Sequence, residues 1–431
     1  MMKSISSGSG IVSQLLRDVP LPRLVRIRQR YERPLLPDIE AAFLERLRGS
    51  GVLSGIKPGM SVAVGVGSRG ITDQQRIIKL LISELKEKGA VPFLFPAMGS
   101  HGGARAEGQQ AMLEGMGYSA EAMGAPIRAT MEVVGMGLAE NGLTCWFDAA
   151  AAAADGIIIV NRVKPHVAFR GRYESGLMKM LAIGLGKQKG ADTCHNLGFG
   201  RMEENILALG RRAIATGKIL FGVALLENAC HDLCRIEVLP AGMIEAAEPA
   251  LQEQAKSLEP RIPFDQMDVL IIDEIGKNIS GTGFDTNLVG RSHTPFISCE
   301  RPRITRIAAL DITEESHGNA NGLGILDFTT WRAFEKFSFE DTYPNSLTST
   351  VPLSVKIPMI LKNDREAIQA AIKTCNIPDH REVRLGRIKN TLQAHLMEIS
   401  ETLLAEAGAN PALEILGDPY ELSFDEAGNL F

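Results

Sequence analysis

The chain has 431 residues, of which 45% are hydrophobic and 23% are charged, and its formal net charge is −5. This length predicts two domains, with three as the alternative, and the composition is that of an ordinary globular protein. The slightly negative charge gives none of the basic surface that nucleic acids or anionic membranes select, so we expect no nucleic-acid partner and no membrane partner.

The six cysteines are scattered and form no CxxC pair, which is typical of reduced thiols in the cytoplasm. Residues 1–20 lack the apolar segment of a secretory signal, and no apolar stretch is long enough to span a bilayer. We therefore expect a cytoplasmic protein with a small-molecule ligand, and the oligomeric state, a homo-oligomer included, stays open.

The first half of the chain repeats a strand, a turn and a helix. Residues 61–70 form a predicted strand that ends in a glycine-rich turn, and residues 77–89 form an amphipathic helix. Thr72 and Gln75, just before that helix, have the spacing of a capping box. A second strand at 91–95 leads into another glycine-rich turn, which favours a parallel sheet. Further predicted elements are a helix at 39–47, short strands in 131–147, a strand at 156–160, a helix at 201–216, a strand at 219–226 and a helix at 241–258.

A proline-containing segment at 259–263 is the expected domain boundary. We predict an N-terminal domain at 1–262 and a C-terminal domain at 263–431, whose tail is free to pack back on the first domain. Strands are expected at 269–276 and 304–311, helices at 328–337 and 364–374, and a strand with a short helix in the last forty residues. The predicted fold is α/β, with two domains of mostly parallel sheets and flanking helices and an active-site cleft between the domains.

Two of the glycine-rich turns carry side chains that suit catalysis. In the first, Ser68 and Arg69 follow a strand, and the Arg69 guanidinium suits a carboxylate or phosphate. The spacing is neither that of a dinucleotide fingerprint nor that of a P-loop, and a tight turn with a surface arginine is an equal alternative. In the second, His101 lies between Gly99 and Gly102 as a candidate acid or base, against the alternative of a solvated turn histidine.

The segment 161–199 follows a buried strand and holds three more candidates. In α/β proteins, ligands bind at the carboxyl ends of strands, which favours a role for His166. Lys179 has apolar neighbours, and desolvation would disfavour its charged form and help it act as a nucleophile or an attachment point, unless it extends to water. His195 follows Cys194, and either could bind a metal, although a histidine in a helix can also be an ordinary hydrogen-bonded residue.

The loop at 280–291 follows a strand of the predicted second domain. It is polar and rich in glycine, and it contains Asn287 and Arg291. We interpret it as that domain's contribution to the cleft. The alternative is a structural turn in which Asp285 and Asn287 cap the backbone.

Taken together, these segments resemble the nickel-dependent lactate racemase family, whose members carry a nickel-pincer nucleotide. The resemblance covers roughly residues 60–300 and rests on the order and spacing of the motifs. The matching motifs are Ser68-Arg69, Gly99-Ser100-His101, Pro165-His166, Gly176-Leu177-Met178-Lys179 and His195, which lies sixteen residues after the lysine.

The resemblance implies a role for each candidate. Lys179 would be joined covalently to a thioamide of the cofactor, and His195 would be the protein ligand to nickel. His101 and His166 would act as acid and base on the substrate hydroxyl. By the same resemblance, Arg69 would bind the substrate carboxylate. We further assign substrate binding to Ser68 and Arg291, and cofactor binding to Gly99, Gly102 and Asn287.

The chain also departs from the lactate-specific members. They have an acidic residue three positions before the arginine, where this chain has Val66, and a proline after it, where this chain has Gly70. The second-domain motif with Gln and Lys is replaced at 281–291. We therefore expect a racemase or epimerase of a 2-hydroxy acid other than lactate. The alternatives are a metal-free anion- or nucleotide-binding protein and a non-catalytic protein that stores or delivers the pincer nucleotide.

Overall fold

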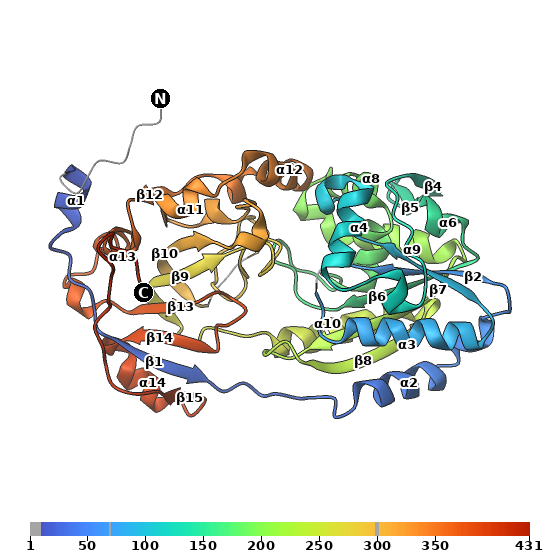
Figure 1. The fold of residues 1–431 in the computed structure, drawn as a ribbon, viewed down its shortest axis with the longest axis horizontal. Coiled ribbons are helices and arrows are strands. Elements are labelled where there is room, and N and C mark those ends of the chain that lie inside the picture. The colour runs from blue at the N-terminus through green and yellow to red at the C-terminus, as the bar shows by residue number, and fades with distance from the viewer. Residues whose placement is uncertain (1–9, 69, 298–300) are drawn as a thin grey trace. The chain divides into compact units, whose positions relative to one another are not determined.

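The computed structural model describes residues 10–68, 70–297 and 301–431, which belong to two compact units. We call residues 32–259 with 348–350 the five-stranded unit. The described parts of 1–31, 260–347 and 351–431 are the eight-stranded unit. Figure 1 traces the elements of both units in the colours of the chain.

The N-terminal segment differs from the predicted grouping of residues 1–262. Strand β1 (Leu24–Gln29) pairs antiparallel with β14 (Leu396–Ser400) and with β15 (Leu413–Ile415). The start of the chain and its C-terminal tail therefore share one sheet of the eight-stranded unit. Strand β1 was not predicted, because its pairing partners lie more than 350 residues away in the sequence.

The five-stranded unit is built on a sheet with the strand order β3-β2-β6-β7-β8. Its first four strands are parallel, as the sequence predicted, and β8 is an unpredicted antiparallel edge. The strands are β2 (Ser61–Val66), β3 (Val91–Pro96), β6 (Gly156–Arg162), β7 (Ile219–Glu227) and β8 (Leu233–Pro240), with a separate hairpin of β4 (Val133–Leu138) and β5 (Thr144–Asp148). The helices are α2 (Ile39–Gly49), α3 (Gln74–Glu87), α4 (Ala106–Gly115), α5 (Ala120–Met123), α6 (Ala149–Ala153), α7 (Leu177–Lys179), α8 (Lys187–His195), α9 (Met202–Ala215) and α10 (Ile244–Leu258).

Side chains that alternate between the two faces of each strand determine which residues form the core of this unit. Val62, Val64 and Val66 project from one face of β2 into a cluster with the apolar residues of α3. The predicted capping box before α3 is wrong. The Thr72 hydroxyl donates instead to the carbonyl of His231, and the Gln75 amide donates to the carbonyl of Met116. Both side chains thus bind carbonyl groups from other parts of the chain and do not cap the helix.

The eight-stranded unit has the strand order β12-β11-β10-β9-β13-β14-β1-β15. Strands β9 to β13 pair in parallel, and β14, β1 and β15 are antiparallel. The helix predicted at 328–337 is only partly correct, because its first three residues form β11. The remaining elements are α1 (Ile11–Leu16), β9 (Gln266–Ile275), β10 (Arg303–Ile312), β11 (Phe328–Thr330), α11 (Trp331–Glu335), α12 (Phe339–Ser349), β12 (Met359–Leu361), α13 (Asp364–Lys373), β13 (Leu385–Ile388) and α14 (Leu404–Ala409).

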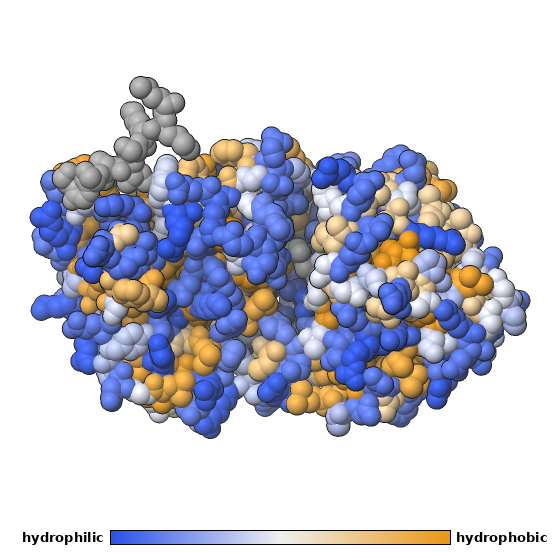
Figure 2. All heavy atoms as spheres, viewed as in Figure 1, coloured by the Kyte–Doolittle hydropathy of each residue, from blue (hydrophilic) through white to orange (hydrophobic). Residues whose placement is uncertain are grey.

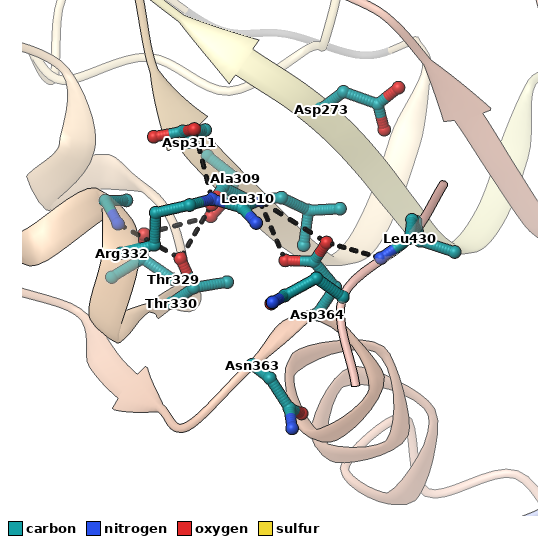
Figure 3. Close-up of polar contacts among 12 residues, drawn as sticks. Asp273, Ala309, Leu310, Asp311, Thr329, Thr330, Arg332, Asn363, Asp364 and Leu430 are labelled. Atoms are coloured by element: carbon teal, nitrogen blue, oxygen red, sulfur yellow. Dashed lines mark hydrogen bonds and ion pairs between the residues drawn. The ribbon is translucent and has the colours of Figure 1, made fainter. Parts of the chain in front are cut away.

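A buried carboxylate fastens the C-terminal tail of this unit. Asp364, the first residue of α13, is only 2% exposed and accepts the backbone N–H of Leu430 over 2.9 Å. Figure 3 shows Arg332 reaching both Asp364 and Asp311, with closest atoms 3.1 Å apart in each ion pair. Burial raises the pKa of Asp364. The tail is therefore held by a polar network as well as by apolar packing on α13.

The face seen in Figure 2 is mostly hydrophilic, and its apolar residues form separate patches. Within the described ranges, the structure contains no helix that is both long and apolar enough to cross a membrane.

Candidate functional site

The candidate residues of the five-stranded unit lie in the segments that follow β2, β3 and β6, after the carboxyl ends of these parallel strands, where α/β sheets bind ligands. Ser68 lies two residues after the end of β2 and is half-buried, whereas Arg69 lies outside the described residues. The turn after β2 packs against the end of β6. A Cβ atom on Gly67 would lie 3.3 Å from Oδ1 of Asn161, so this approach leaves little room for a side chain.

The turn after β3 carries His101. Its two flanking glycines, Gly99 and Gly102, have φ angles of 58° and 67°, a left-handed region that favours glycine. A Cβ on Gly102 would also lie 2.7 Å from the backbone nitrogen of Gln109. The imidazole Nδ1 of His101 lies 2.7 Å from the carbonyl oxygen of Met98. The turn therefore fixes both the backbone and the ring of His101.

The loop after β6 carries His166 and is held by a buried carboxylate. Glu174 has no exposed surface, and it accepts the backbone N–H groups of His166 (2.8 Å) and Gly171 (3.1 Å). Lys256 of α10 pairs with Glu174 over 3.0 Å. The His166 ring lies 4.6 Å from the ring of Phe169, measured between centroids. These contacts fix the conformation of this loop, which its sequence alone does not predict.

The two histidines have opposite tautomers in their neutral forms. A carbonyl oxygen can only accept, so Nδ1 of His101 must carry the proton that it donates to Met98, and Nε2 is the unprotonated nitrogen. In His166, the backbone N–H of Ala168 donates to Nδ1 over 3.1 Å, so the ring proton lies on Nε2. His101 can thus gain a second proton without losing its hydrogen bond, whereas His166 cannot.

Lys179 ends the short helix α7, which continues into a π-helical turn at Met180–Gly184. The start of α7 is capped by Glu248 of α10, which accepts the backbone N–H of Met178 over 2.9 Å. A Cβ on Gly176 would lie 2.6 Å from Oε1 of Glu248, so a side chain here would displace the carboxylate that caps α7. The half-buried Lys179 is therefore placed by a glycine and a carboxylate that hold its helix.

Glu248 makes the stability of the protein pH-dependent. It is fully buried, and desolvation raises its pKa from 4.5 to about 7. A carboxyl with a raised folded-state pKa favours folding below its unfolded pKa, and that stability is lost as the pH rises from about 4.5 to 7. The loss is roughly 3 kcal/mol. We expect Glu248→Gln to unfold at higher urea concentration than wild type at pH 8 and to approach wild type at pH 5.

The matched control for that measurement is Glu253→Gln. Glu253 is an exposed residue of the same helix, and it pairs with Lys256. An exposed pair contributes less than about 1 kcal/mol, so this variant should follow wild type at both pH values. A Glu248→Gln variant whose difference from wild type is equal at pH 5 and pH 8 would contradict the assigned titration.

His195 ends α8 and is close to Lys179. Its Nδ1 is buried and has no hydrogen-bond partner among the residues that the structure describes. Burial and, to a smaller extent, the positive charge of Lys179 lower the pKa of His195 to about 4. The ring of Phe199 lies 5.3 Å from the His195 ring and 6.0 Å from the His166 ring, between centroids. The phenyl ring of Phe199 is thus close to both imidazoles.

The neighbouring thiol does not suit metal binding. Cys194 is fully buried, its Sγ lies 3.5 Å from Sδ of Met202, and burial raises its pKa to about 12. The thiol is therefore protonated at neutral pH. Across the described part of the chain, no group of three or more His, Cys, Asp or Glu side chains could hold a metal ion. A neutral imidazole with an unpaired buried nitrogen, as in His195, fits a metal whose other ligands come from a bound organic group.

The two candidates of the eight-stranded unit have mainly structural contacts. The Arg291 guanidinium pairs with Asp327 over 2.5 Å and donates to the carbonyls of Ile304 and Thr305. The backbone N–H of Asn287 donates to the Asp285 side chain, as the structural alternative expected. We therefore leave Arg291 and Asn287 out of the site that follows.

Sequence reasoning missed a different polar cluster in this unit. Lys277 and Asn321 both donate to the carbonyl of Gly281, over 2.6 and 3.0 Å. His293 is 7% exposed, and its buried Nδ1 has no hydrogen-bond partner among the described residues. Burial, followed by the charge of Lys277, lowers the pKa of His293 to about 4. Lys277 and His293 lie on the connection between β9 and β10, whereas Asn321 lies between β10 and β11, and no spacing in the sequence indicates that the three residues belong together.

Comparisons with known proteins support the fold and leave the family open. No family model matches the chain, and no curated protein matches it by sequence. Among solved structures, the chain is similar to the lactate racemase apoprotein from Thermoanaerobacterium thermosaccharolyticum, with a TM-score of 0.52 and 12% sequence identity. The similarity covers 86% of this chain and 99% of that one. The α/β fold with mostly parallel sheets is thus shared with a racemase apoprotein.

Proposed function

We propose that the chain is a racemase or epimerase that acts on a 2-hydroxy acid with a nickel-pincer nucleotide. The observation that carries this proposal is the proximity of Lys179 to His195, an amine whose charge acts on an imidazole that has a buried, unpaired Nδ1. The shared fold with a lactate racemase apoprotein supports it. Lys179 would hold the nucleotide, and His195 would bind its nickel.

When bound, the cofactor would accept a hydride from carbon 2 of the substrate and return it. The protein would supply binding, orientation and proton transfer. Gly99 lies beside the π-helical turn that follows Lys179, since its Cβ would be 3.2 Å from Cγ2 of Ile183. Protein atoms fill the Cβ directions of both Gly99 and Gly102, so these glycines would contact the cofactor through their backbone atoms. Arg69, with Ser68 before it, would bind the substrate carboxylate.

The tautomers assign the proton-transfer roles. His101 would take the proton from the substrate hydroxyl on Nε2, because its imidazolium form keeps the Nδ1–H bond to Met98. His166 would donate a hydrogen bond from its Nε2–H to the oxygen atom at carbon 2, because Ala168 holds its Nδ1 as an acceptor. His101 would give its added proton back to that oxygen atom when the hydride returns to carbon 2. Acting as a base, His166 would have to give up the Ala168 bond. The two histidines are therefore not equivalent in the resting protein.

The experiment is chiral chromatography of single-enantiomer 2-hydroxy acids incubated with protein from a cofactor-producing host. Substrates deuterated at carbon 2 make the assay specific for hydride transfer. We expect the opposite stereoisomer to form with the deuterium retained. Exchange of that deuterium with water would indicate proton abstraction from carbon, and an unchanged stereoisomer with every acid tried would leave the chain without this activity.

A further inference from the structure

A fully buried ion pair lies in the five-stranded unit beside the site. Nζ of Lys187 lies 2.9 Å from Oδ2 of Asp148, and neither side chain has any exposed surface. Burial lowers the pKa of Lys187. The backbone of Lys187 is also left-handed, with φ at 52°, which is uncommon for a residue with a side chain. Burying two charged side chains carries a desolvation penalty that apolar side chains of similar volume would not carry. The ion pair is therefore unlike a feature that serves only to stabilise the fold.

The buried lysine reaches the backbone around His101 through one glutamine. Nζ of Lys187 donates to Oε1 of Gln109 over 2.9 Å and to the carbonyl of Pro96, the last residue of β3. Nε2 of Gln109 then donates to the carbonyls of Gly99 (2.9 Å) and His101 (3.1 Å). Gln109 has no exposed surface, and these bonds use its acceptor and both of its donor hydrogens.

The same network joins two elements of the site. Lys187 is the first residue of α8, and His195 is the last. Gln109 lies on α4, and Figure 1 shows α4 and α8 side by side. A chain of hydrogen bonds therefore runs from the start of the helix that ends at His195 to the turn that carries His101.

We propose that Gln109 and Lys187 are positioning residues for His101. They hold the turn after β3 in the conformation in which Nδ1 of His101 donates to Met98, and so they favour the tautomer in which Nε2 is the basic nitrogen. They also fix the position of this turn relative to α8. The catalytic consequence rests on the proposed function of His101, whereas the structural consequence, a single fixed tautomer, does not.

The test is Gln109→Met, which keeps the volume of the side chain and removes its hydrogen bonds. The ring-nitrogen chemical shifts of His101 in ¹⁵N-histidine-labelled protein report its tautomer, with the signal assigned by its loss in His101→Gln. We expect one fixed tautomer with a protonated Nδ1 in wild type and averaged shifts for both ring nitrogens in Gln109→Met. In protein loaded with cofactor, we expect kcat to fall roughly 10- to 100-fold with KM changed less than about twofold.

The matched control is Gln110→Met. Gln110 is the next residue of α4, is exposed, and donates to Glu114 over 2.9 Å. It should leave the His101 shifts and kcat at wild-type values. If Gln109→Met proves unstable, Gln109→Asn keeps a polar group but is one methylene too short to bridge, and it should give the same averaged shifts.

Each outcome decides between the alternatives. A fixed wild-type tautomer in both Gln109 variants would overturn the inference, whatever their activity, because lost activity would then have another cause. Averaged shifts with unchanged kcat would overturn the catalytic part. If wild type shows a fixed tautomer that Gln109→Met releases but no acid is racemised, the positioning stands and the proposed function fails.

Discussion

Replacing His195 with alanine should remove nickel from protein purified from a cofactor-producing host. The unpaired Nδ1 of His195 is the one nitrogen donor that we assign to the metal, and its low pKa keeps the ring neutral at pH 7. Removing a partner of a metal ligand already costs 10- to 100-fold in affinity or activity, so losing the ligand itself should cost more than about 100-fold. Elemental analysis should give about one nickel per chain in wild type and less than about a tenth in the variant.

The matched control for this metal measurement is His380→Ala. His380 lies in a short 3-10 turn of the eight-stranded unit, and it is half-buried like His195. It should retain wild-type nickel and turnover. Stoichiometric nickel with full activity in His195→Ala would show that the metal has another ligand.

The second large effect is expected for His101→Gln. Glutamine is close to histidine in size but cannot accept a proton, so the variant loses general-base catalysis while its pocket stays filled. Removal of a positioned base typically costs 10²- to 10⁴-fold, and we expect kcat to fall by about that amount. The measurement is the initial rate of racemisation for each enantiomer, with nickel content determined on the same samples.

His166→Gln provides the comparison for His101→Gln. Its side-chain amide can still donate a hydrogen bond to the substrate oxygen, so kcat should fall less, by roughly tenfold. A larger loss in His166→Gln than in His101→Gln would contradict the assignment of the base. Nickel retained at wild-type levels in both variants would show that the losses are not failures of metal binding.

The functional candidates could be predicted because local signals marked them. β-Branched runs such as 156–160 indicated buried strands, and glycines beside His101 and Lys179 indicated turns with close approach. These signals gave the parallel sheet, which the structure confirms. The roles of His101, His166, Lys179 and His195 remain predictions, because they rest on the resemblance and on the geometry described above.

The supporting residues could not be predicted, because their surroundings come from distant parts of the chain. Gln109 and Lys187 have the composition of a helix surface, yet both are fully buried, and the two bonded residues are 78 positions apart in the sequence. Glu248 likewise lies 70 residues from the N–H that it accepts. Strand β1 depends on a pairing with the last strands of the chain. No periodicity within a short window carries such information.

The central claim is that Lys179 carries a nickel-containing nucleotide beside His195. Intact-mass analysis of protein from a cofactor-producing host, followed by peptide mapping, tests it most directly. We expect an added mass that maps to the peptide containing Lys179 and is absent in Lys179→Ala, together with about one nickel per chain. An unmodified mass without bound nickel, in a host shown to load a known nickel-pincer enzyme, would contradict the account.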